Sequence, residues 1–166
     1  MSPTKLRNIP IVNLTDNDFV CSPTEVDVCD VSYPNHCPQN CSCYNHVVRC
    51  SHAQLKNIPY EQMPIDTEEL YLDANEIQEI PAELTNRLIY LIRIDLSYNK
   101  LRVIPANIFS NLTRLETLIL SYNKIRCLES SSFKGLKNLR ILSLHGNEIS
   151  TIPEGSFNDL TALSHV

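Results

Sequence analysis

The chain has 166 residues, of which 43% are hydrophobic and 20% are charged, a balance typical of a folded protein. Fourteen Lys and Arg stand against nineteen Asp and Glu, so the formal net charge is −5 at pH 7. That sign argues against a dedicated nucleic-acid-binding protein, and a site for any polyanion has to be local. The sequence contains no run of about 18 consecutive apolar residues and therefore predicts no membrane span.

The first 36 residues carry no periodic pattern. Residues 1–21 include a sequon at Asn13 and end at Cys21, and residues 22–36, which are rich in Pro, Asp and Ser, indicate a linker that contains Cys29. The first ten residues have basic side chains but no apolar stretch of about 7–15 residues behind them, so no signal peptide is predicted.

Residues 37–60 open with four cysteines in the spacing CxxxCxCx6C and are predicted to form an N-terminal cysteine cap. Spacing alone allows three disulfide connectivities for four cysteines. Zinc is the competing interpretation, because the cysteines are flanked by His36, His46 and His52, which could complete a tetrahedral site. These histidines lack the H-x3–5-H spacing typical of zinc sites.

Cysteines and sequons together indicate the compartment. Six of the seven cysteines fall within the first fifty residues, which is a local framework typical of secreted proteins. N-glycosylation sequons occur at Asn13, Asn40 and Asn111, although Asn40 is crowded by neighbouring cysteines and is the weakest of the three. We therefore expect a secreted, extracellular protein, of which this chain is a fragment.

A 24-residue period begins after the cap. It is marked by asparagines that each stand in an LxLxxNxL pattern, namely Asn75, Asn99, Asn123 and Asn147. This pattern is typical of leucine-rich repeats and predicts four of them over residues 61–162, with residues 163–166 opening a fifth. We expect a right-handed solenoid with an irregular or 3-10 convex side, parallel strands on the concave face, and the asparagines in a buried polar ladder. The strands are predicted near residues 69–73, 93–97, 117–121 and 141–145.

Catalytic motifs are missing from the sequence. It contains no GxSxG, HExxH, P-loop or GxGxxG, and only three glycines are available to build glycine-rich loops. We therefore predict a binding protein that is not an enzyme and that uses no cofactor or metal.

The cap and repeats resemble those of the Slit family of secreted axon-guidance glycoproteins, and in particular the fourth leucine-rich domain of that family. Three stretches carry the resemblance: HCPQNCSCYNHVVRCSHAQLKNIP, LTRLETLILSYNKIRCL and LRILSLHGNEISTIPEGSFNDLTALSH. The resemblance implies a matrix ligand that signals through Roundabout receptors, with the main receptor contact in a different domain. For the fourth domain it implies homodimerisation and heparan sulfate binding. The alternative is a structural matrix or receptor-ectodomain repeat module.

The resemblance also implies a disulfide pattern. In extracellular leucine-rich repeat proteins the cap pairs first with third and second with fourth, which corresponds here to Cys37–Cys43 and Cys41–Cys50. Residues 1–21 resemble the tail of a preceding domain's C-terminal cap, so Cys21 would find its partner outside this chain. Of the seven cysteines this leaves two, so Cys29 is predicted to pair with Cys127; the alternative is that Cys127 is a free thiol near the convex side.

Two surfaces are predicted to bind partners. Side chains that point outward from the concave strands are expected to contact a protein or a second copy of the chain; they are Tyr71, Ile92, Arg93, Asp95, Tyr98, Ile119, Tyr122, Arg140, Ile141 and His145. Basic residues at matching positions of repeats two and three are expected to repel one another and to bind heparan sulfate; they are Lys100, Arg102, Lys124 and Arg126. A solvated loop balanced by Glu116 and Glu129 is the alternative for the second surface.

Overall fold

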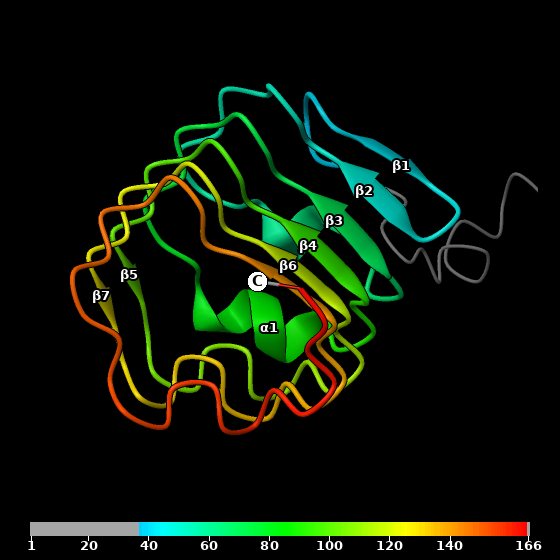
Figure 1. Ribbon diagram of the computed structural model, residues 1–166. Helices are drawn as coiled ribbons and strands as arrows, with labels where there is room; N and C mark the ends of the chain where they lie inside the picture. The colour runs from blue at the N-terminus through cyan, green and yellow to red at the C-terminus, as the bar shows by residue number, and fades with distance from the viewer. Residues whose placement is uncertain (1–36, 166) are drawn as a thin grey trace, which may run out of the picture. The chain divides into compact units, whose positions relative to one another are not determined.

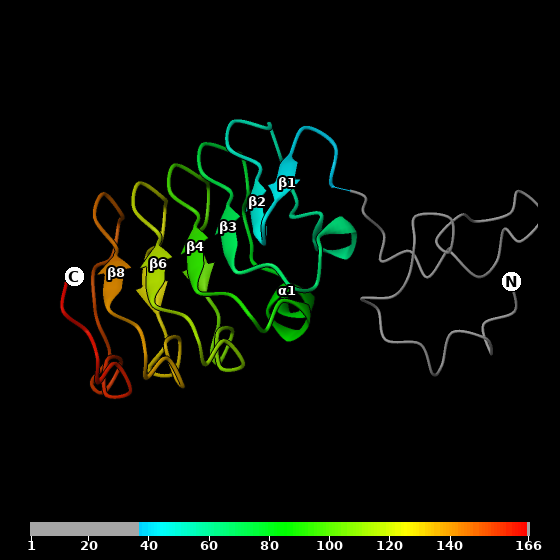
Figure 2. The same ribbon diagram turned by 90° about the vertical axis from the view of Figure 1, so that its right-hand side faces the viewer.

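The structure is a computed structural model, and it describes residues 37–165. A six-stranded sheet in the order β1-β2-β3-β4-β6-β8 forms one side of a coil of stacked repeats (Figures 1 and 2). All neighbouring pairs are parallel except β1 with β2. The strands are β1 (Ser42–Tyr44), β2 (Val47–Arg49), β3 (Glu69–Tyr71), β4 (Arg93–Asp95), β6 (Thr117–Ile119) and β8 (Ile141–Ser143).

The register confirms the predicted repeats, because residues 24 apart are direct partners. Leu70 lies opposite Ile94, which lies opposite Leu118 and then Leu142, and all four are at most 1% exposed. Each strand has three residues, two fewer than predicted. The chain leaves the strand early because the next residues turn toward the asparagine ladder, although Leu72 N–H still donates to Asp95 C=O at 2.8 Å.

Leucines and phenylalanines fill the interior of the coil. Phe109 and Phe133 are 1% and 0% exposed, and the Phe133 and Phe157 rings stack with centroids 5.9 Å apart. The interior is less closed in repeat four, where an apolar hollow of about 500 Å³ is lined by residues including Leu144, Ile149 and Phe157. Stacking of one repeat on the next therefore closes the core, as the periodic sequence predicts.

The return segments are more regular than predicted. Repeat one contains the helix α1 (Ala82–Arg87), and the cap contains the 3-10 helix η4 (Tyr60–Gln62). Strands β5 (Val103–Ile104) and β7 (Cys127–Leu128) form a second, two-stranded parallel sheet. α1 forms because its sequence, AELTNR, begins with strong helix formers and places an acid in the first turn and a base in the last.

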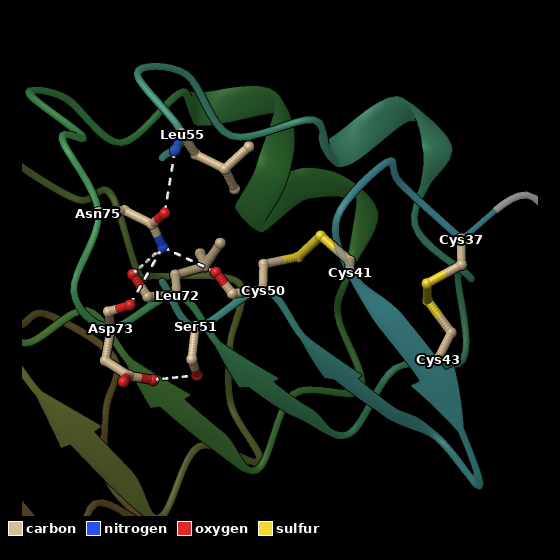
Figure 3. The surroundings of a disulfide bond; sticks show 9 residues. All are labelled: Cys37, Cys41, Cys43, Cys50, Ser51, Leu55, Leu72, Asp73 and Asn75. Carbon is tan, nitrogen blue, oxygen red and sulfur yellow. Dashed lines mark hydrogen bonds between the residues drawn. A yellow bond between two sulfur atoms is a disulfide. The ribbon is translucent and has the colours of Figure 1, made fainter. Parts of the chain in front are cut away.

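The predicted asparagine ladder is present, and Figure 3 shows its first member, Asn75. Asn75 Nδ2 donates to Cys50 C=O at 2.8 Å and to Leu72 C=O at 2.9 Å, while its Oδ1 accepts from Leu55 N–H at 2.9 Å. Asn99, Asn123 and Asn147 repeat this pattern one turn further each. Each asparagine of the ladder thus forms hydrogen bonds both within its own repeat and to the preceding turn of the chain.

Two disulfides join the cap to itself, Cys37–Cys43 and Cys41–Cys50 (Figure 3), which confirms the implied pairing. Since the four sulfurs are bonded to one another, they are not zinc ligands. Cys127 is exposed and pairs with no cysteine of residues 37–165. Cys29 lies outside the described residues, as do Cys21, Asn13 and the segments 1–21 and 22–36, so the Cys29–Cys127 bridge stays a prediction.

Candidate protein-binding face

The outward side chains of the large sheet form two columns, which we call the sheet face. Strand register places Glu69, Arg93, Thr117 and Ile141 in one column and Arg49, Tyr71, Asp95, Ile119 and Ser143 in the other. Between the two columns lies a buried apolar row, so alternation along each strand separates the core from the surface; the row is Val48, Leu70, Ile94, Leu118 and Leu142. Aromatic, aliphatic and charged groups therefore alternate on one continuous surface.

Five of the ten predicted contact residues lie on these strands: Tyr71, Arg93, Asp95, Ile119 and Ile141. Ile92 and Arg140 directly precede β4 and β8. Tyr98, Tyr122 and His145 follow the strands, so our reason for placing them was wrong: a turn, and not strand alternation, brings them to the surface.

Tyr71 lies between two guanidinium groups. The Arg49 Cζ is 4.1 Å and the Arg93 Cζ 5.4 Å from the centroid of its ring, while its hydroxyl donates to Glu69 Oε2 at 2.7 Å. Burial, the Glu69 hydrogen bond and the Glu69 charge raise the pKa of Tyr71, and the two arginines oppose that shift. Arg93 Nε is buried and has no hydrogen-bond partner among the described residues.

Arg49 was missed by the sequence analysis. It belongs to the cap, and the step from Arg49 to its sheet partner Tyr71 is shorter than the repeat period that relates Tyr71 to Asp95. The cysteine pattern that ends at Cys50 could have located β2, because the cap has to supply the first strand of the sheet.

A second aromatic cluster lies where the chain leaves the strands. The Tyr98 and Tyr122 rings stack with centroids 4.5 Å apart and planes 12° apart, and His145 meets Tyr122 edge-on at 5.2 Å. Both tyrosines have left-handed backbones, with φ of 53° and 54°. Such a backbone costs about 1–2 kcal/mol for a residue with a side chain, and an aromatic pair recovers about 0.5–1.5 kcal/mol. Stability alone therefore does not account for these two tyrosines.

The predicted basic ladder is partly neutralised. Lys100 Nζ lies 3.0 Å from Glu76 Oε2, and Arg126 Nε lies 2.7 Å from Glu148 Oε2. The hydrogen bond to Lys100 and the charge of Lys100 lower the pKa of Glu76. The expected repulsion between neighbouring cations is thus relieved within the chain.

Two of the four basic residues keep their charge unpaired. Within residues 37–165, no ion pair involves Arg102 or Lys124, and both are exposed. In the alternative interpretation Glu116 and Glu129 balance these charges, but Glu116 Oε2 lies 3.6 Å from Arg140 Nε instead.

The sequons that fall within the described residues are accessible. Asn111 is exposed and its Nδ2 donates to Asn86 Oδ1 at 2.7 Å, while Asn40 is exposed in the cap with a φ of 64°. Residues 37–165 hold no group of three or more His, Cys, Asp and Glu placed to bind a metal, and none of the helices described there is long and apolar enough to cross a bilayer.

Parallel strands, an asparagine ladder and an open sheet face define a leucine-rich repeat interaction scaffold. The chain belongs to the leucine-rich repeat family, which it matches over residues 67–125 and 113–166. It is 43% identical to leucine-rich repeat-containing protein 3 of Bos taurus over 65 residues, covering 37% of this chain and 25% of that protein. It is 37% identical to Peroxidasin of Drosophila melanogaster over 62 residues, covering 37% of this chain and 4% of that protein.

Solved structures agree on the fold. The TLR13–ssRNA13 complex superposes with a TM-score of 0.68 and 32% identity over 75% of this chain and 18% of that chain. A leucine-rich repeat protein of Leptospira interrogans superposes with a TM-score of 0.58 and 31% identity over 68% of this chain and 29% of that chain. The chain spans a quarter or less of the length of the two curated relatives, so it corresponds to one part of those proteins.

Proposed function

We propose that this chain is a protein-binding segment of a secreted, Slit-like guidance ligand and that the sheet face, together with the adjoining Tyr98–Tyr122 stack, is its contact surface, with self-association as the contact. The observation that carries the proposal is the Tyr71–Arg49–Arg93 cluster beside the Tyr98–Tyr122 stack. Tyrosine and arginine are the residue types that contribute most to protein interfaces.

The Slit-like part of the proposal rests on the resemblance of the cap and of repeats three and four. The two cap disulfides support an oxidising, extracellular environment. The family's main receptor contact lies in a different domain, so we do not assign Roundabout binding to this chain. A parent transcript that encodes further leucine-rich domains and EGF-like modules supports this proposal, whereas one that encodes a transmembrane helix favours a receptor ectodomain.

The test measures self-association of residues 1–166 by sedimentation velocity. The double variant Arg93→Glu with Tyr98→Ala should weaken the dimer at least tenfold, since two interface anchors are lost together. The matched control is Lys137→Glu with Ile152→Ala, which makes the same kinds of change at exposed positions outside the sheet face. If both double variants associate like the unmodified chain, the sheet face is not the dimer contact.

A further inference from the structure

One turn position forms a column of left-handed residues beside the sheet face, which we call the turn column. Its members are His52, Ala74, Tyr98, Tyr122 and Gly146, with φ of 56°, 53°, 53°, 54° and 71°. Backbone hydrogen bonds hold them in sequence: Ala74 N–H donates to Ser97 C=O at 2.9 Å, and Tyr98 N–H donates to Ser121 C=O at 3.0 Å. Each member therefore lies next to the following one.

The aromatic stack in this column is closed at one end. Tyr122 packs against the backbone of Gly146, where a Cβ would lie 2.7 Å from the Tyr122 Cδ1, and Tyr98 covers the other face of Tyr122. The remaining face of Tyr98 is turned away from Tyr122, toward the side of the column occupied by Ala74. Ala74 contributes only a methyl group, and Tyr98 is 58% exposed.

The spacing leaves room for one planar group over Ala74. Neighbouring strands lie about 4.8 Å apart, which matches the 4.5 Å between the Tyr98 and Tyr122 centroids. A planar side chain from outside, placed over Ala74, would therefore continue the stack at the same interval.

We propose that this position receives an arginine side chain of a protein partner, stacked on the free face of Tyr98. The proposal rests on the proposed function and names the chemistry of the partner. The chain already covers two of its other tyrosines in this way: the Arg49 Cζ lies 4.1 Å from the Tyr71 centroid and the Arg114 Cζ lies 5.8 Å from the Tyr90 centroid. Within residues 37–165, no arginine or lysine stacks on Tyr98.

Charge favours a cation over a neutral ring. Asp73 directly precedes Ala74, and its carboxylate accepts one hydrogen bond, from Ser51 Oγ at 2.6 Å. Asp95 lies on the adjacent strand; its Oδ1 accepts hydrogen bonds from Ser97 N–H at 3.0 Å and from Ser97 Oγ at 2.6 Å, and its Oδ2 lies 3.8 Å from Arg93. These two carboxylates, one residue before Ala74 and three residues before Tyr98 in the chain, put negative charge on the turns around this position and favour a guanidinium, which combines a planar face with a positive charge.

The experiment titrates residues 1–166, labelled with ¹³C in the tyrosine rings, with two capped tripeptides at low salt. One is Gly-Arg-Gly, and the other replaces arginine with citrulline, which is planar and neutral. The arginine peptide should move the Tyr98 ring signals more than those of Tyr44, which is 78% exposed and lies in β1. The citrulline peptide should bind about two- to fivefold more weakly, the range for a cation on an exposed ring.

Two variants locate the site. Ala74→Tyr fills the position and should abolish the shift at Tyr98, whereas Ala82→Tyr, at an exposed position in α1, should leave it unchanged. Equal binding of both peptides would overturn the assignment to arginine. A shift that is as large at Tyr44 as at Tyr98, or that survives Ala74→Tyr, would overturn the site. Because the titration reads a single chain, a shift at Tyr98 combined with failure of the self-association test refutes only the proposed dimer.

Discussion

Replacing Asn99 with Ala tests the role of the asparagine ladder. Asn99 is 6% exposed; its Oδ1 accepts from Ile77 N–H at 3.0 Å, and its Nδ2 donates to Leu72 C=O at 2.8 Å and to Leu96 C=O at 3.1 Å. The two carbonyls have a second amide each, from Asn75 and from the next asparagine along the ladder. The Ile77 N–H has no second acceptor within residues 37–165.

These contacts set the size of the effect. One buried donor left unsatisfied costs about 1–3 kcal/mol, and weakening two shared carbonyl bonds costs about 0.5–1.5 kcal/mol each. The Asn99→Ala variant should therefore lose about 2–6 kcal/mol of unfolding free energy, a large fraction of the roughly 5–15 kcal/mol of a typical domain.

Urea unfolding followed by circular dichroism measures this loss, with Asn158→Ala, at an exposed position, as the control. Asn147→Ala should cost less than Asn99→Ala, because Asn147 is only partly buried. If Asn99→Ala changes stability no more than Asn158→Ala does, the ladder does not hold the repeats together and the reasoning is refuted.

Three further predictions concern single positions. Gly146→Ala should destabilise the chain by about 1–2 kcal/mol, because it adds a side chain at a φ of 71° and brings a Cβ within 2.7 Å of Tyr122; unchanged urea unfolding would contradict this. Glu76→Gln should raise the salt concentration at which the chain elutes from heparin, since it frees the charge of Lys100. Earlier or unchanged elution would remove Lys100 from the heparan sulfate prediction. Peptide mapping without reduction should join Cys127 to a peptide of the linker, and recovery of Cys127 as an alkylated thiol would refute that bridge.

The repeats could be predicted from the sequence because one residue type recurs at each position. In a column such as Leu70–Ile94–Leu118–Leu142, an apolar residue recurs every 24 positions. This recurrence predicts that the four residues are buried and stacked, so the strand positions and their parallel order could be predicted. The disulfide pairing could not be predicted from the cysteine spacing alone, which allows three connectivities; the family resemblance selected one of them.

The surface was harder to predict. Tyrosine is uncommon in left-handed backbones, so nothing in the sequence signalled that Tyr98 and Tyr122 would stack in a turn. The pairing of Lys100 with Glu76 was missed for a different reason. Both residues occupy the same position of adjacent repeats, but the prediction compared cations with cations and did not compare each cation with the acid one turn away.

The turn column lies one residue before the asparagine ladder, and this adjacency separates two tasks along the chain. The asparagine at each turn is hydrogen-bonded to backbone groups inside the molecule, while the residue before it lies at the surface at Tyr98, Tyr122 and Gly146, is partly buried at Ala74, and differs between repeats. A substitution there can alter what the surface recognises while the internal hydrogen bonds stay intact. Such a position allows recognition to evolve repeat by repeat, with the fold held constant by its neighbour.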